Sequence, residues 1–201
     1  MPGIASMGGR GFREAKRNHL ERLVKHVKKG LVDYDIAGFL MKVNMFEGIA
    51  TTSSCSGRIA ILYSTSMTSK RDARILEAWH DPGECKKRIC YYSTLSFEPM
   101  FYSWVSLQAP VINFIVEDVD GAEVIVGCAE KAGMRRVGYR KYRHGGFQVW
   151  VSGGDKLHVT LPSSCSVLLE ACRILEAYKS RLAIFSDCVL EHWPLRRQEK
   201  A

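Results

Sequence analysis

The chain has 201 residues, of which 46% are hydrophobic and 25% charged, and its formal net charge is +8 at pH 7. This length provides a sizeable core for one domain or two small ones, and no apolar run approaches the roughly 18 residues of a membrane-spanning helix. The excess of basic residues favours a nucleic-acid or other polyanionic partner.

The N-terminal quarter predicts two helices. The first nine residues lack the apolar region of a signal peptide, so we expect a flexible tail over 1–9 and a cytoplasmic protein. Apolar residues at helical spacing predict a helix over 11–29, which Gly30 ends. Asp33 is a plausible N-cap for a second helix, which runs to about Asn44.

The middle of the chain alternates strands and short polar segments. Two strands are predicted at 48–53 and 58–64, and a loop rich in Ser, Thr and charge follows. The run Ile75–Trp79 predicts a strand that ends at His80. Further on we expect a short helix over 84–92 and a long strand over 96–108.

The C-terminal half predicts a helix, a strand meander and a long helix. Asp118 or Asp120 caps a helix that runs to Lys131. Glycine-rich turns join strands at 134–140, 146–152 and 157–161, and an amphipathic helix follows over 164–188. We therefore expect an α+β fold in which an antiparallel sheet is flanked by helices. Its parts are a single globular domain over 10–193 and a basic tail over 194–201.

Seven cysteines are scattered along the chain, and no two form a C-x-x-C pair. Cys85 and Cys90 are the closest two. An odd number without ligand spacing is not typical of a disulfide scaffold or a zinc site. We therefore expect mostly buried, reduced thiols and no metal site.

The octapeptide Thr51–Arg58, with the sequence TTSSCSGR, concentrates hydroxyls, a thiol, a glycine and an arginine between two apolar segments. Hydroxyls donate and accept hydrogen bonds, and a guanidinium matches carboxylate or phosphate. Glycine lets the backbone approach a ligand closely. One interpretation is a loop that holds a polar or anionic ligand. The other is a turn whose hydroxyls bond their own backbone, and local chemistry leaves both open.

Basic residues gather in two segments. Each segment alone is compatible with a solvated surface, but two separate basic clusters favour RNA binding. The N-terminal cluster is Arg10, Arg13, Lys16, Arg17, Arg22, Lys25, Lys28 and Lys29, and the second is Arg135, Arg136, Arg140, Lys141, Arg143 and His144.

Several nucleotide-binding and hydrolase motifs are absent from the sequence. It contains no G-x-G-x-x-G after a strand, no P-loop, no H-E-x-x-H and no G-x-S-x-G. A nucleotide-like cofactor would therefore bind outside the usual Rossmann arrangement.

The octapeptide Thr51–Arg58 resembles the signature of the third wybutosine-synthesising protein family, in its archaeal and eukaryotic forms. Met134, Val137 and His158 depart from the family pattern, as does the tract Ser64–Ser69. Weaker matches follow in family order at Val32–Ile36, Trp79–His80, Phe97–Pro99, Ala132–Gly138 and Leu157–Pro162.

This resemblance implies a methyltransferase that uses S-adenosyl-L-methionine and acts on phenylalanine tRNA. The implied substrate is the tricyclic wybutosine-type purine just 3′ of the anticodon, which is methylated on a ring nitrogen. The family's fold is not the Rossmann methyltransferase fold. The alternative function is a non-catalytic RNA-binding domain that uses the serine-rich segment as a phosphate cradle. Cofactor binding by the protein alone distinguishes the two.

The resemblance also suggests roles for individual residues. Asp33 and His80 match an acid and a histidine of the family and are the proton-handling candidates, although Asp33 is also a helix N-cap and His80 a turn residue. The expected cofactor-binding residues are Ser53, Ser54, Cys55, Gly57 and Arg58, and the expected RNA-binding residues are Arg13, Lys16, Arg17 and Glu98.

Two of these residues have a plainer alternative. The alternative for Arg58 is a surface ion pair. Cys55 would suit a buried thiol better than a nucleophile, because methyl transfer to nitrogen needs no covalent intermediate and nothing nearby in the sequence lowers the thiol's pKa. The aromatic residues between Trp79 and Trp104 are more typical of a core than of stacking platforms.

Overall fold

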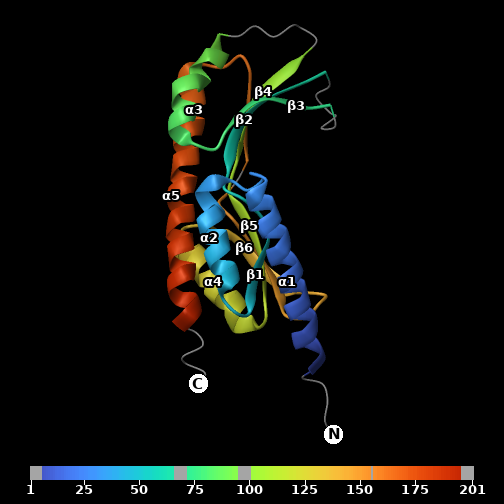
Figure 1. Cartoon of the computed structure of the whole chain (residues 1–201). Helices are drawn as coiled ribbons and strands as arrows, with labels where there is room; N and C mark the ends of the chain where they lie inside the picture. Colours follow the sequence, from blue (N-terminus) through green and yellow to red (C-terminus); the bar gives the residue numbers. More distant parts are fainter. Residues whose placement is uncertain (1–5, 66–71, 95–100, 155, 196–201) are drawn as a thin grey trace. The chain divides into compact units, whose positions relative to one another are not determined.

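The computed structural model describes residues 6–65, 72–94, 101–154 and 156–195 (Figure 1). They form five α-helices, a short 3-10 helix and two four-stranded antiparallel sheets, which confirms the expected α+β class. The chain divides into two compact units whose segments alternate along the sequence, so no linker composition marks their boundary. Unit 1 comprises Met1–Ser56, Val111–Gly153 and Arg181–Ala201, and unit 2 comprises Gly57–Pro110 and Gly154–Ser180.

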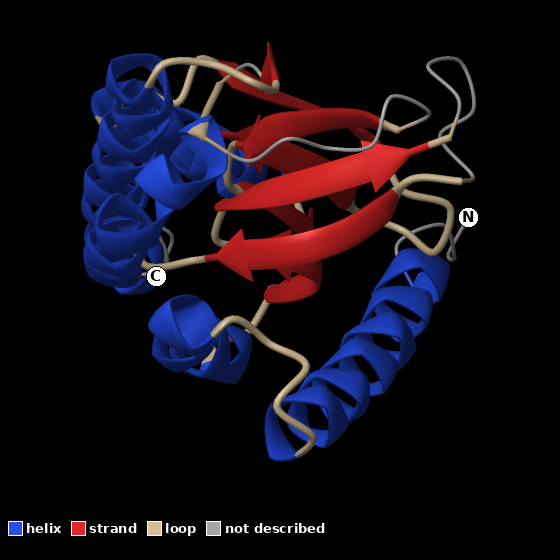
Figure 2. Cartoon of the chain, turned by 90° about the horizontal axis from the view of Figure 1, so that it is seen from above, coloured by secondary structure: helices blue, strands red, loops and turns tan. Residues whose placement is uncertain are grey.

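Unit 1 is a sheet with helices on both faces (Figure 2). On one face Phe114 meets Phe39 and Phe185 edge to face, with ring centroids 6.0–6.5 Å apart. On the other face Phe12 packs against Ala50 and Ile115. The strand order is β1 (Ile49–Cys55), β5 (Val111–Val116), β7 (Phe147–Ser152) and β6 (Arg136–Lys141), and the helices are α1 (Ser6–Lys28), α2 (Tyr34–Met45), α4 (Val119–Lys131) and the second part of α5 (Cys165–Leu195).

Unit 2 is a second sheet covered by the first part of α5 and a short helical segment. Buried side chains of β2, β4 and α5 fill its core, with Trp79 among the largest. Asp81 caps the short helix by accepting a hydrogen bond from the Glu84 amide over 2.6 Å. The strand order is β3 (Arg74–Trp79), β2 (Arg58–Ser64), β4 (Tyr102–Gln108) and β8 (Leu157–Thr160), and the helical segment is α3 (Pro82–Arg88) with η1 (Ile89–Ser93).

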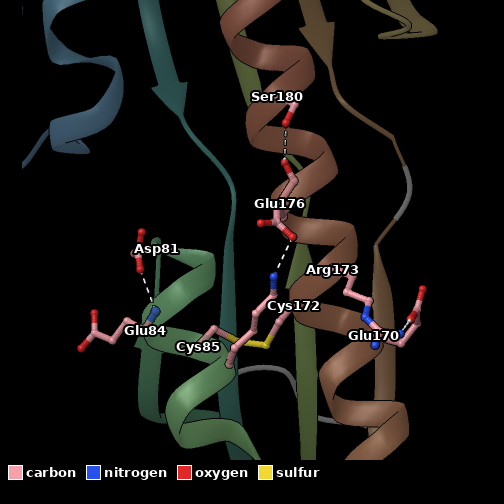
Figure 3. A network of polar contacts seen from close by, with 9 residues as sticks. Asp81, Glu84, Cys85, Glu170, Cys172, Arg173, Glu176 and Ser180 are labelled. Carbon is pink, nitrogen blue, oxygen red and sulfur yellow. Dashed lines mark hydrogen bonds and ion pairs between the residues drawn. A yellow bond between two sulfur atoms is a disulfide. The ribbon is translucent and has the colours of Figure 1, made fainter.

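Three disulfides link helices within the units. Figure 3 shows the disulfide between Cys85 and Cys172, with Glu176 on the same helix as Cys172. Glu176 forms an ion pair with Lys86, and their charged atoms lie 2.7 Å apart. The expectation of reduced thiols is therefore wrong for six cysteines, because partners separated by 60 to 87 residues cannot be paired from spacing. The pairs are Cys85–Cys172 and Cys90–Cys165 in unit 2 and Cys128–Cys188 in unit 1.

The predicted C-terminal meander is wrong in its third strand. Strands β6 and β7 pair as expected, but β8 pairs with β4 in the other sheet. The chain leaves β7 through Gly154, whose φ is 150° and at which a Cβ would lie 2.8 Å from the Tyr178 hydroxyl. The glycine-rich turn therefore marks a change of sheet rather than a hairpin.

Other boundaries also differ from the predictions. Strand β5, a mostly apolar run after Pro110 that Asn113 interrupts, was not expected. Helix α1 begins at Ser6, so residues 6–9 belong to a helix and not to the expected tail. Helix α5 continues through Pro194 to Leu195. Residues 96–100 of the long predicted strand lie outside the described residues.

Candidate functional site

Most of the octapeptide Thr51–Arg58 is strand, so neither the ligand-holding loop nor the self-bonded turn describes it as a whole. Its first five residues end β1, Ser56 and Gly57 connect the two strands, and Arg58 begins β2. Gly57 has a φ of 86°, and a Cβ there would lie 3.0 Å from the Gln108 carbonyl oxygen. Glycine is required here for both reasons.

Strand β1 is an edge strand of the unit 1 sheet, and side chains bond its backbone. The buried Asn44 accepts from the Thr51 amide over 3.0 Å and donates to the Thr51 hydroxyl over 2.7 Å. Arg22 of α1 donates to the Thr52 carbonyl over 2.8 Å. The pairing with β5 shifts register between Thr51 and Ser53, which leaves Thr52 as a bulge. These side-chain bonds satisfy backbone groups of β1, which is paired with β5 on one edge only.

Asp33 precedes α2, but its side chain makes no capping hydrogen bond. Its Oδ2 accepts from the amide of the fully buried Ser56 over 2.7 Å. The carboxylate therefore holds the backbone of the octapeptide at Ser56, within unit 1. The side chain of Asp33 does not cap α2, as the N-cap alternative predicted.

A pocket of about 520 Å³ lies between α1 and β1 in unit 1. Its polar wall combines the hydroxyls of β1 with two imidazoles and a guanidinium from α1, and its apolar wall includes Leu23, Leu31 and Val32. This volume is within the range of about 300–1,000 Å³ that is common for ligand sites. The polar lining residues are His19, Arg22, His26, Thr51, Thr52, Ser53 and Ser54.

The fold changes the ionisation of His19, which lines the pocket. Burial, followed by the positive charges of Arg22 and His144, lowers the pKa of His19 below its ordinary value. Its Nδ1 lies 2.9 Å from the Arg22 guanidinium, which can only donate. The neutral ring therefore accepts at Nδ1 and carries its proton on Nε2.

The predicted cofactor residues do not all meet in this pocket. Ser53 and Ser54 line it, whereas Gly57 and Arg58 belong to unit 2. Cys55, half-buried at the end of β1, is the one cysteine among the described residues that forms no disulfide. The pocket also contains His19, Arg22 and His26, which the sequence did not single out as a site. Their spacing of three and four residues on α1 was the available signal.

In unit 2 the half-buried Arg58 donates from Nε to the Gln108 side chain over 3.1 Å. It forms no ion pair with any described residue, so the surface ion-pair alternative is not what the structure shows. Lys179 of α5 donates to the Gly57 carbonyl over 3.2 Å. Arg58 therefore starts a strand that is hydrogen-bonded on both edges, by β3 and by β4.

The remaining predicted residues are distributed as follows. His80 is half-buried directly after β3 in unit 2, whereas Asp33 belongs to unit 1. Arg13 and Arg17 are exposed on α1, and Lys16 is half-buried and donates to the Phe46 carbonyl. Glu98 lies outside the described residues.

One group of possible metal ligands occurs among the described residues. The ligand atoms of Cys128, Cys188 and His192 lie within 4.8 Å of one another. The two sulfurs are bonded to each other, so they are not thiolate ligands in this state.

The fold and the sequence define a known class of protein. Residues 14–186 match the family described as methyltransferase TYW3, and the chain belongs to this family. The resemblance expected from the octapeptide is thereby confirmed. No helix in the described ranges is long and apolar enough to cross a membrane.

Two relatives illustrate the match. A Thermococcus sibiricus protein is 26% identical over 154 residues, which cover 77% of each chain. A Pyrococcus abyssi protein is 30% identical over 156 residues, which cover 78% of this chain and 74% of that one. Both are named tRNA(Phe) 7-((3-amino-3-carboxypropyl)-4-demethylwyosine(37)-N(4))-methyltransferase, the second with the suffix 2.

Solved structures share the fold. The PH1069 protein from Pyrococcus horikoshii superposes with a TM-score of 0.76 at 22% identity, covering 89% of this chain and 95% of that one. A hypothetical protein from Aeropyrum pernix superposes with a TM-score of 0.56 at 20% identity, covering 79% and 98%. The family is a methyltransferase family whose fold differs from the Rossmann arrangement.

Proposed function

We propose that this chain is an S-adenosyl-L-methionine-dependent tRNA methyltransferase. Its substrate is the tricyclic wybutosine precursor base next to the anticodon of phenylalanine tRNA, which it methylates on a ring nitrogen in the cytoplasm. Family membership and the names of the two relatives support this assignment. The observation that carries it is the unit 1 pocket, which the hydroxyls of the family signature line.

The donor set of the pocket fits the cofactor. The hydroxyls of Ser53 and Ser54 would bond ribose or carboxylate oxygens, and the Arg22 guanidinium suits a carboxylate. The apolar side chains of Leu31 and Val32 suit the face of an adenine ring. When bound, S-adenosyl-L-methionine supplies a methyl group on a sulfonium sulfur.

The protein's own part in such a reaction is alignment, proton handling and exclusion of water. Asp33 is the proton-handling proposal in unit 1, because it matches an acid of the family pattern and its carboxylate holds the octapeptide through the Ser56 amide. His80 is the corresponding proposal in unit 2. The exposed Arg13 and Arg17 would contact RNA phosphates, and Lys16 would contribute charge beside them.

Calorimetric titration of the protein with S-adenosyl-L-methionine tests the assignment. We expect the wild type to bind and Ser54→Leu to lose measurable binding, because the larger side chain fills the polar wall of the pocket. Thr160→Leu is the matched control, an exposed strand residue of unit 2 that should leave binding unchanged. RNA binding without any cofactor binding by the wild type would instead favour the non-catalytic RNA-binding domain.

Two further variants test the residues that lie outside the pocket. Arg58→Ala should weaken cofactor or tRNA binding while the protein stays folded, because a single hydrogen bond to Gln108 contributes only about 1 kcal/mol. His80→Ala should lower the methylation rate. Unchanged binding and turnover would remove the residue concerned from the site.

A further inference from the structure

One row of residues crosses the unit 1 sheet on the face opposite its aromatic core. Ser53 of β1 pairs with Asn113 of β5, Asn113 with Trp150 of β7, and Trp150 with Gly138 of β6. Register partners in an antiparallel sheet point to the same side. The flanking residues of β5 and β7 belong to the core, so this row points away from it.

Trp150 is held in an unusual position for so large an apolar side chain. It is 41% exposed, and its ring covers Gly138, where a Cβ would lie 2.5 Å from the ring atom Cζ2. Any other residue at 138 would lift the ring from the sheet. Glycine thus lets the indole lie against the backbone with its outer side accessible to solvent.

Polar groups continue the row toward the family signature. Asn113 donates from Nδ2 to the hydroxyl of the exposed Ser53 over 2.8 Å. Two strand spacings, about 10 Å, separate β1 from β7. A planar ligand on Trp150 would therefore lie within reach of Ser53, which also lines the pocket of unit 1.

The segment that carries Trp150 is basic. The segment 135–152, which carries β6, the turn and β7, contains four arginines and one lysine and neither aspartate nor glutamate. These five basic side chains are exposed. An accessible aromatic ring among exposed cations matches a nucleic-acid strand, whose bases stack and whose phosphates are anionic. A neutral or basic protein surface would gain nothing from these cations.

We propose that Trp150 is a stacking platform for an unpaired RNA base, with Asn113 beside it to bond the base edge and the basic residues of β6 to contact the flanking phosphates. This proposal rests on the RNA substrate of the proposed function and specifies how a loop base is held. It gives unit 1 a surface for the base next to the pocket lined by Ser53 and Ser54.

The test measures binding of a fluorescent RNA stem-loop that carries an unpaired purine in its loop. A second stem-loop has an abasic site at the same position. Trp150→Leu should weaken binding of the purine loop by roughly tenfold or more, as loss of one stacked base does. Trp150→Phe should retain most of the affinity, since phenylalanine also stacks. The abasic loop should bind wild type and Trp150→Leu equally.

Tyr139→Leu is the matched control, because Tyr139 is similarly exposed on the neighbouring strand but its hydroxyl bonds Glu123 of α4, on the core side of the sheet. It should bind both RNAs as the wild type does. Titration of Trp150→Leu with S-adenosyl-L-methionine should match the wild type and shows that the fold and the pocket are intact. A wild type that binds both loops equally, or a Trp150→Leu variant that discriminates between them, overturns the platform while the proposed function stands. A wild type that binds neither loop overturns the RNA substrate as well.

Discussion

The α3–η1 segment of unit 2 and strand β1 of unit 1 are attached to their surroundings in different ways. Two disulfides join α3–η1 to α5. Side chains of Arg22 and Asn44 bond the backbone of strand β1, and Asp33 bonds the amide of Ser56, which directly follows the strand. One segment is therefore held covalently and the other by directional polar contacts.

The difference matches what each segment presents to solvent. The disulfides of α3–η1 lie among buried apolar side chains, so this attachment presents few polar groups to solvent. The side chains that hold β1 bond its backbone and leave Ser53 and Ser54 among the residues that line the pocket. An edge strand satisfied in this way avoids pairing with another chain and still offers polar groups to a ligand. The following variants test this comparison, from the largest expected effect to the smallest.

Removal of one of the two disulfides that join α3–η1 to α5 should have the largest effect on stability. The double variant Cys85→Ala and Cys172→Ala opens the short loop that this disulfide closes beside Cys90–Cys165, and it also removes two fully buried sulfur atoms. Together these changes should lower the free energy of unfolding by about 4 kcal/mol. Urea unfolding in non-reducing buffer measures the loss. In reducing buffer the difference from wild type should shrink, and Cys55→Ala should unfold like the wild type in both. Equal stability of the double variant and the wild type without reductant would contradict a covalent attachment.

A substitution at Gly57, in the connection between β1 and β2, should have the next largest effect on stability. Gly57→Ala introduces a side chain at positive φ and against the Gln108 carbonyl, which should cost about 3 kcal/mol. Gly38→Ala is the control, because this helical glycine has nothing within 4 Å of the added Cβ. It should raise stability by about 0.5–1 kcal/mol. If Gly57→Ala unfolds at the same urea concentration as the wild type, the backbone at residue 57 can shift without a loss of stability.

Loss of one side-chain bond to β1 should have a moderate and local effect. Asn44→Ala leaves the buried Thr51 amide and hydroxyl without this partner and should cost about 2 kcal/mol. Hydrogen exchange of the Thr51 amide should accelerate more than exchange in β7 at the centre of the same sheet. The exposed Asn18→Ala is the control and should change neither quantity. Uniform acceleration across the sheet would mean that Asn44 stabilises the unit as a whole rather than this edge.

Most elements were predictable because their pattern is local. The strand Arg58–Ser64 has the predicted bounds, and Asp118 caps α4 as one of two predicted candidates. Strand β5 was missed because its sequence, apolar at every position except Asn113, lacks the regular alternation that marks a half-buried strand. The change of sheet after β7 and the three disulfides depend on long-range pairing, which no local pattern encodes.

Only the part of the site that the octapeptide contributes was predictable from the sequence. Hydroxyl content alone drew attention to Ser53 and Ser54. His19 and His26 reach the same pocket because α1 packs along β1, a tertiary contact that sequence spacing does not reveal. Trp150 escaped notice for a similar reason, since its place over Gly138 depends on strand register.

The smallest effect concerns His19 beside the β1 edge. Its pKa is lowered in the folded protein, so between that pKa and the ordinary value of 6.5 the unfolded chain binds more protons than the folded one. The corresponding contribution to stability is complete above pH 6.5 and is lost as the pH falls through the folded pKa. Unfolding in urea at pH 7 and pH 5 should therefore show a smaller acid loss for His19→Gln than for wild type.

Glutamine suits this experiment because its amide oxygen can still accept from Arg22 while the titrating ring is gone. Titrations common to both proteins cancel in the comparison. Asn18→Ala, a non-titrating change next to His19 on α1, should keep the wild-type pH dependence. If His19→Gln loses as much stability on acidification as the wild type, the ring takes up its proton equally in both states. The polar contacts at the β1 edge would then be independent of pH in this range.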